Sequence, residues 1–245
     1  MAKNVPLKRE KRKLSVEVAP KTLDDHIFFG LKLDEEQKIF RDAIWNPDID
    51  IVFCNAKAGC GKTLISAATA LLLKEYGRVD AIDYMTPAGV HEHKQGLLPG
   101  TLEQKSYFST IPFRQALITL GYDPERIIRS EDNLDAQKEG TAIVIAQTDS
   151  YIRGINISSA DERTVLILDE SQNMKEDALR TALTRVSEGG RVIVIGHEGQ
   201  CDLKDPRESG FVKCLEHFRG QERCEVCTLS TNHRGWISAW ADEPW

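Results

Sequence analysis

The chain has 245 residues, of which 41% are apolar and 29% are charged, with a formal net charge of −6 at pH 7. This composition is typical of a folded globular domain, and it excludes collagen-like, low-complexity and uniformly basic nucleic-acid-binding proteins. No apolar run reaches the length of a membrane span and the N-terminus lacks a secretory apolar core, so we expect a cytoplasmic protein with no membrane partner.

The first 22 residues carry a basic cluster, K-R-E-K-R-K at residues 8–13, with few large apolar side chains to anchor it. We expect a basic, flexible N-terminal arm over residues 1–22 and a single domain over residues 23–245. The cluster is either a solvated charge run or a contact for a phosphate backbone or an acidic neighbour.

Residues 33–44 have the pattern of a helix, with Asp34 as N-cap and Gln37 three residues later. This spacing alone explains Gln37 as half of a capping box. The alternative is base recognition, because a carboxamide offers a donor and an acceptor together and pairs with the N6/N7 edge of adenine.

A phosphate-binding loop is predicted between a buried strand at residues 51–54 and an Ala/Leu-rich helix. Residues 56–63, A-K-A-G-C-G-K-T, match G-x-x-x-x-G-K-[ST] except that Ala56 replaces the first glycine. Glycines let backbone N–H groups turn toward phosphate, the lysine reaches the β- and γ-phosphates, and the threonine hydroxyl binds Mg²⁺. The residues expected to bind the nucleotide here are Ala58, Gly59, Cys60, Gly61, Lys62 and Thr63. The alternative is an accidental Gly/Lys loop.

Further apolar runs predict strands at residues 79–85, 142–146, 165–168, 191–195 and 224–229, separated by helical patterns. The run at 165–168 delivers Asp169 and Glu170 at its carboxyl end. Because parallel strands end at one edge of the sheet, Asp169 is expected to reach Mg²⁺ and Glu170 to polarise water toward the γ-phosphate. Two acids after a strand are otherwise a common helix N-terminal pair.

Polar residues also follow the last two strands. Gln200, in the loop after residues 191–195, is either a γ-phosphate sensor or a solvated loop residue, and nearby His197 has no paired metal ligand. Arg234, beyond residues 224–229, either neutralises transferring phosphate charge or lies on the surface or in a partner contact.

The six cysteines are spread along a chain without an export signal, which favours free thiols. Cys214, His217, Cys224 and Cys227 have a spacing similar to that of a small zinc site. Cys224 and Cys227 are three apart on a predicted strand, where they face opposite sides, and this argues against convergence on one metal.

Taken together, these motifs resemble the PhoH-like ATPase family and, through it, the first motor domain of superfamily 1 helicases. The resemblance covers about residues 33–240, and His197 stands where the family usually has Asp. It rests on Gln37, the 59–63 loop, G-L-L-P-G at 96–100, Y-I-R-G at 151–154, D-E-S-Q-N at 169–173, and Gly196 with Q-C-D-L at 200–203.

The resemblance implies an α/β, RecA-like P-loop NTPase fold, a mainly parallel sheet with helices on both faces, that binds ATP and Mg²⁺. The implied roles are adenine recognition for Gln37, phosphate and metal binding for Lys62 and Thr63, metal support for Asp169, water activation for Glu170, γ-phosphate sensing for Gln200, and an action near that phosphate for Arg234.

The leading functional prediction is an Mg²⁺-dependent ATPase coupled to single-stranded RNA, with helicase-like activity, or to assembly of its own subunits. A single motor domain leaves one side of ATP uncovered, which predicts a homo-oligomeric ring, for example a hexamer. The alternatives are a nucleotide-dependent scaffold with little hydrolysis and a small-metabolite kinase, and the latter would need an arginine-rich lid that the sequence does not show.

Overall fold

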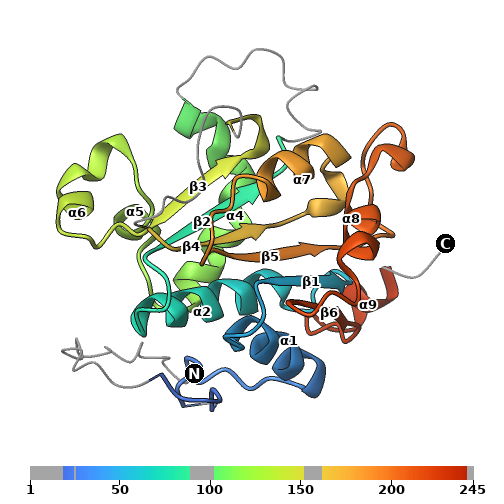
Figure 1. Cartoon of the computed structure of the whole chain (residues 1–245), viewed down its shortest axis with the longest axis horizontal. Coiled ribbons are helices and arrows are strands. Elements are labelled where there is room, and N and C mark those ends of the chain that lie inside the picture. The colour runs from blue at the N-terminus through green and yellow to red at the C-terminus, as the bar shows by residue number, and fades with distance from the viewer. Residues whose placement is uncertain (1–18, 25, 89–101, 152–161, 242–245) are drawn as a thin grey trace.

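The computed structural model describes residues 19–24, 26–88, 102–151 and 162–241, with the side chains of 102–106 and 151 excepted (Figure 1). The G-L-L-P-G motif at 96–100, most of the Y-I-R-G motif and residues 1–18 of the predicted arm lie outside the described residues. Within the described ranges, no helix is both long and apolar enough to cross a membrane.

A six-stranded sheet of parallel strands forms the centre of the molecule, in the order β3-β2-β4-β5-β1-β6. Its strands are rich in β-branched and other apolar residues and are covered on both faces, as expected of parallel strands. The bounds are β1 (Ile51–Ala56), β2 (Ala81–Thr86), β3 (Val144–Thr148), β4 (Thr164–Leu168), β5 (Arg191–Gly196) and β6 (Cys224–Leu229). The prediction of a parallel sheet is confirmed.

Helices cover both faces of this sheet (Figure 1). One core joins alternate strand residues such as Val52 and Ile167 to α1 (Glu35–Trp45), α2 (Lys62–Glu75) and α4 (Leu102–Thr119). The other joins the intervening residues, such as Phe53 and Leu168, to α7 (Glu176–Leu183) and α8 (Phe211–Phe218). The period-2 alternation of strand side chains therefore divides the apolar residues between two cores.

Short elements connect these layers. The short helices are α5 (Pro124–Ile127), α6 (Leu134–Lys138) and α9 (Trp236–Ala241), and the 3₁₀ turns are η1 (Glu131–Asn133), η2 (Asp149–Tyr151), η3 (Ser171–Asn173) and η4 (Pro206–Glu208). α8 begins at Phe211, because Pro206 and its neighbours form η4 before it.

The strand order determines where the functional loops lie. β1 pairs on one side with β5 and on the other with β6, so Asn55 lies opposite Gly196 and Ala56 lies opposite Leu229. β4 is the next strand beyond β5. The loops that follow β1, β4, β5 and β6 consequently leave the sheet at the same edge, where the sequence places its polar motifs.

Candidate functional site

The loop between β1 and α2 has the backbone geometry of a phosphate cradle. Gly59 and Gly61 have φ values of 78° and 81°, a region that residues with a Cβ rarely adopt. A Cβ on Gly59 would also lie 2.8 Å from Asn232 Oδ1. α2 begins immediately afterwards at Lys62, so its N-terminal N–H groups face this loop.

Ala56, the departure from the loop motif, fits without backbone strain. It is the last residue of β1, buried and paired with Leu229. Among described residues other than glycine, positive φ occurs at Phe29 and Glu170 and not at Ala56. The backbone at this position is extended and does not require glycine.

The first two helical residues of α2 meet the two acids that follow β4. Thr63 Oγ1 donates a hydrogen bond to Asp169 Oδ2 at 2.8 Å, and Lys62 Nζ lies 3.9 Å from Glu170 Oε1. These groups are more than 100 residues apart in sequence. The predicted grouping of cation, hydroxyl and paired carboxylates is therefore present at one edge of the sheet.

Asp169 is a buried carboxylate, 1% exposed and surrounded by donors. Its Oδ2 also accepts the Tyr84 hydroxyl at 3.0 Å, and its Oδ1 accepts the Glu170 backbone N–H at 2.8 Å. Burial, and then the neighbouring Glu170 charge, raise the pKa of Asp169, while Lys62 and the Thr63 hydrogen bond oppose this shift. Tyr84 could not be assigned to this site from the sequence, because only the β2–β4 pairing brings it to this carboxylate.

Glu170 is held in an unusual backbone conformation, with φ 52° and ψ 36°. Its Oε2 accepts a hydrogen bond from Gln172 Nε2 at 2.6 Å. The Gln172 side-chain oxygen in turn accepts the His197 backbone N–H at 3.1 Å, so one carboxamide connects the end of β4 to the loop after β5. Gln172 belongs to the D-E-S-Q-N motif, but no role for it follows from the sequence.

Gln37 completes a capping box at the start of α1 and also contacts the phosphate loop. Asp34 Oδ1 accepts the Gln37 backbone N–H at 2.8 Å, and Gln37 Oε1 accepts the Asp34 N–H at 3.1 Å. Gln37 Nε2 donates to the Cys60 carbonyl at 2.9 Å. A carboxamide has two N–H donors and two acceptor lone pairs, so one N–H donor and one acceptor lone pair are left to pair with a base.

The segment after β6 packs against the same loop. The His233 N–H donates to the Gly59 carbonyl at 3.0 Å, and the His233 ring lies 2.9 Å from Asp34 Oδ2. A Cβ on Gly59 would lie 3.1 Å from Arg234 Cγ. Arg234 is therefore beside the phosphate loop of its own chain, and it is exposed.

Gln200 lies in the loop after β5, where its N–H donates to the His197 carbonyl at 3.0 Å. Through His197 and Gln172 this loop is connected to Glu170. The structure thus brings Gln37, Lys62, Thr63, Asp169, Glu170 and Arg234 to the loop directly, and Gln200 through this connection.

The Thr63 hydroxyl and the Asp169 carboxylate suit Mg²⁺, which takes oxygen ligands and keeps several waters, so few protein ligands are needed. Their 2.8 Å contact shows that the two oxygens converge. Within the described ranges, no group of three or more His, Cys, Asp and Glu residues is arranged to hold a metal.

The cysteine spacing that resembles a zinc site does not make one. Cys224 belongs to the core under α7 and α8, whereas Cys227 belongs to the opposite core. Burial raises the pKa of the Cys214 thiol to about 11 and that of Cys227 to about 12. The described cysteines are free thiols.

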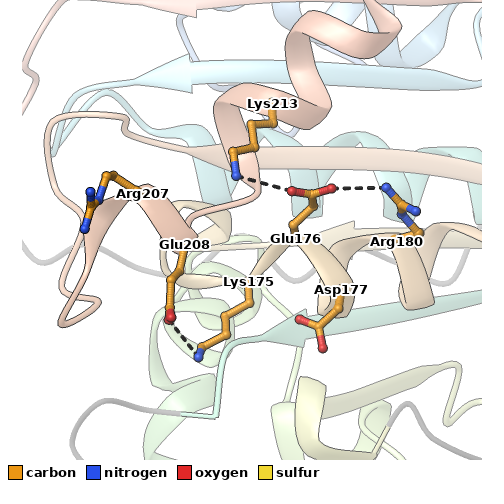
Figure 2. A pocket seen from close by; sticks show the side chains of 7 residues that line it. All are labelled: Lys175, Glu176, Asp177, Arg180, Arg207, Glu208 and Lys213. Atoms are coloured by element: carbon orange, nitrogen blue, oxygen red, sulfur yellow. Dashed lines mark hydrogen bonds and ion pairs between the residues drawn. The ribbon is translucent and has the colours of Figure 1, made fainter.

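An open hollow of about 520 Å³ lies beside α7 and α8, away from the phosphate loop residues (Figure 2). Its lining residues are Lys175, Glu176, Asp177, Arg180, Arg207, Glu208 and Lys213. Lys175 pairs with Glu208 at 2.7 Å, and Glu176 pairs with both Arg180 and Lys213. Exposed pairs of this kind contribute little binding energy, and the near balance of charge favours neither an anion nor a cation.

Comparisons with known proteins agree with this geometry. The family model described as PhoH-like protein matches residues 32–234. Protein PhoH2 of Bacillus subtilis (strain 168) is 29% identical over 207 residues, which are 81% of this chain and 43% of that protein. Protein PhoH of Escherichia coli (strain K12) is 34% identical over 174 residues, which are 70% of this chain and 46% of that protein.

The chain thus spans slightly less than half the length of these two relatives. Among solved structures, the UvsW helicase of bacteriophage T4 superposes with a TM-score of 0.51 at 13% sequence identity, over 81% of this chain and 60% of that one. At this identity the likeness concerns the fold alone, and it agrees with the RecA-like P-loop NTPase fold expected from the sequence. With the phosphate loop, the paired acids and the family match in agreement, the chain belongs to the PhoH-like protein family.

Proposed function

We propose that this chain binds ATP with Mg²⁺ and hydrolyses it. The observation that carries the proposal is the pairing of Thr63 with Asp169 and of Lys62 with Glu170. These pairs lie beside a loop in which two glycines have left-handed backbone conformations. A hydroxyl, a lysine and two carboxylates at this edge of a parallel sheet are the groups that phosphoryl transfer from a nucleotide uses.

In the proposed reaction each of these residues has a separate role. Backbone N–H groups around Gly59 and Gly61 cradle the phosphates, and Lys62 adds a positive charge at the β- and γ-phosphates. Thr63 and Asp169 would hold Mg²⁺, which supplies charge neutralisation between these phosphates when bound. A Glu170 carboxylate oxygen accepts a proton from the attacking water, and Arg234 stabilises charge that develops on the γ-phosphate.

We further propose that residues 23–245 act as one motor domain, that ATP turnover is coupled to single-stranded RNA, and that subunits assemble as a homo-oligomer. Membership of the family supports the link to RNA. A single motor domain would leave one side of ATP uncovered, and this supports assembly, because a second surface is needed to enclose ATP.

A second candidate is a nucleotide-dependent scaffold with little hydrolysis. The position of Lys62 favours it, because its ammonium group, 3.9 Å from Glu170 Oε1, faces an oxygen that a water-activating base would use. Glu170→Gln separates the two functions, since a scaffold would not need this carboxylate.

Nucleotide binding is tested with Lys62→Ala, measured by calorimetry with ATP and Mg²⁺. We expect loss of measurable binding, because the lysine supplies charge that water does not arrange as well. Lys74→Ala, at the other end of α2, is the matched control and should bind as the wild type does. Equal affinity in Lys62→Ala and the wild type would contradict the proposed site.

Hydrolysis is tested with Glu170→Gln and Arg234→Ala, assayed for ATP affinity and for phosphate release with and without single-stranded RNA. Both variants should keep normal affinity, and Glu170→Gln should lose roughly 10²–10⁴-fold in rate, as expected for loss of a positioned base. Asp169→Asn should weaken both binding and turnover. Full turnover in Glu170→Gln would support the scaffold instead.

A further inference from the structure

We infer that Gln172 is a positioning residue that orients Glu170 for water activation and anchors it to the loop after β5; this inference rests on the proposed ATPase function. Among the described residues, the side-chain hydrogen bonds of Gln172 go to Glu170 and His197, and neither involves the phosphate loop or Asp169. Its effect on the reaction would be exerted through Glu170.

The contacts of Gln172 are those of a fixed connector. Its side chain is 2% exposed and uses both polar atoms, since Nε2 donates to Glu170 Oε2 at 2.6 Å and Oε1 accepts the His197 N–H at 3.1 Å. Its backbone carbonyl also accepts the Cys201 thiol at 3.2 Å. A buried carboxamide with both ends bonded has one orientation, so it presents its N–H to Glu170 in a defined place.

The space around the carboxamide is closely fitted. A Cβ on Gly196 would lie 2.9 Å from Gln172 Oε1 and 3.2 Å from its backbone N. The residue at the end of β5 must therefore be small for Gln172 to reach His197. This explains a glycine at position 196 whose φ is not in the left-handed region.

Glu170 needs such a connector because of its neighbour Lys62. The two charged groups are 3.9 Å apart, beyond the 2.7–2.9 Å typical of a charge-assisted hydrogen bond. The Glu170 side chain is 41% exposed and has room to move. Without the Gln172 hydrogen bond, the carboxylate would be free to close onto Lys62, and both groups would lose their orientation toward the nucleotide.

A second connection between the same two segments provides a control. The Asp202 N–H donates to Asn173 Oδ1 at 2.6 Å, and Asn173 Nδ2 lies 3.4 Å from Asp202 Oδ2. Asn173 therefore joins η3 to the loop after β5, as Gln172 does. Its backbone N–H donates to the Glu170 carbonyl at 2.9 Å, but its side-chain hydrogen bonds go to Asp202 and not to the Glu170 carboxylate. A purely structural role for these connections would make the two residues equivalent.

The test uses Gln172→Met, which keeps the length and removes both hydrogen bonds, together with Gln172→Asn, which is too short to bridge. Asn173→Ala is the matched control. Each variant is made in the wild-type chain and in Glu170→Gln, and kcat and KM for ATP hydrolysis are measured alongside the thermal unfolding midpoint. If Gln172→Met does not fold, Gln172→Asn alone provides the comparison with the wild type.

We expect the Gln172 variants to lower kcat about 10-fold or more in the wild-type background with little change in KM, as the loss of a residue that orients a catalytic group does. In Glu170→Gln they should have no further effect, because the group through which they act is already lost. Asn173→Ala should keep most of the wild-type kcat.

Two results would overturn the inference alone: an active, Glu170-dependent wild type whose kcat is unchanged by the Gln172 variants, or equal losses in both backgrounds and in Asn173→Ala. A wild type without ATP turnover, or one that does not depend on Glu170, would overturn the proposed hydrolysis and this inference with it.

Discussion

At the scale of single residues, Asp169 depends on donors from three parts of the chain. Thr63 comes from α2, Tyr84 from β2, and the Glu170 N–H from the next residue. Tyr84 is 1% exposed and stacks on Phe113, with ring centroids 4.3 Å apart, so its hydroxyl is held rigidly. A carboxylate held in this way has one orientation, which the proposed role of Asp169 as a metal ligand requires.

We predict that Tyr84→Phe weakens Mg²⁺ binding about 10-fold, because the ring packing stays and Asp169 loses one orienting donor. The measurement is the Mg²⁺ concentration that gives half-maximal ATP turnover. Tyr76→Phe, whose ring packs edge-on against Trp45, is the control. An unchanged Mg²⁺ requirement in Tyr84→Phe would show that the hydroxyl serves stability alone.

Gln37 carries a structural and a proposed recognition role in one side chain. We predict that Gln37→Ala narrows the difference in affinity between ATP and GTP, because the remaining donor and acceptor of the carboxamide match adenine. Calorimetry with both nucleotides measures this difference. Asp34→Ala also breaks the capping box and should leave the preference intact; a wild type that binds both nucleotides equally would refute base recognition.

Residues that belong to a local motif or to the carboxyl end of a strand were predictable, and residues whose contacts depend on the order of the strands were not. The capping box at Asp34 and Gln37 follows from a spacing of three, and the structure contains it. Gln172 and Tyr84 gain their contacts only when β4 lies between β2 and β5. Strand order of this kind depends on long-range packing, which a local pattern does not record.

At the scale of elements, two predicted strands begin two residues later than expected: the strand predicted at 79–85 begins at Ala81, and the one predicted at 142–146 begins at Val144. For β3 the cause is visible in the backbone. The backbone of the two preceding residues is bonded elsewhere: the Ala142 N–H donates to the Ala136 carbonyl, and the Ile143 N–H to that of Ile127. The segment that contains α5 and α6 therefore accepts the N–H groups of these two residues, and the strand begins after them. Apolar periodicity cannot distinguish these two sets of hydrogen bonds.

β2 carries an acid, Asp83, in the interior of the sheet. It is 3% exposed, and its Oδ1 has no hydrogen-bond partner among the described residues. Burial raises its pKa to about 7, and the Glu162 charge adds to the shift while Arg129 opposes it. Because the folded chain holds this proton more tightly than the unfolded chain, the free energy of unfolding falls as pH rises from about 4 to 7.

We predict that Asp83→Asn stabilises the fold, and that the gain over the wild type grows by roughly 2–3 kcal/mol between pH 5 and pH 8. Urea unfolding at the two pH values measures it. Asp80→Asn is the control. The hydrogen bond from Arg163 lowers the pKa of Asp80, so the change in unfolding free energy caused by this substitution should depend on pH in the opposite direction. A gain in Asp83→Asn that does not depend on pH would mean that the carboxyl is not protonated in the folded state.

At the scale of the whole molecule, one sheet presents one nucleotide edge. We predict a homo-oligomer in solution, because the exposed side of the site needs a neighbouring surface to exclude water from the γ-phosphate. Light scattering over a range of protein concentrations, with parallel ATPase assays, measures it. Dilution to monomers should reduce turnover per chain, whereas a monomer with full activity would contradict the prediction.

The position of β1 also has a consequence for how the protein is made. β1 carries the phosphate loop, yet both of its sheet neighbours, β5 and β6, are encoded more than 130 residues later. As the nascent chain leaves the ribosome, β1 and its loop emerge long before either partner exists. Contacts of such long sequence separation form late and slowly. A chaperone that shields residues 51–56 during translation would thus act on the strand that later supports the nucleotide.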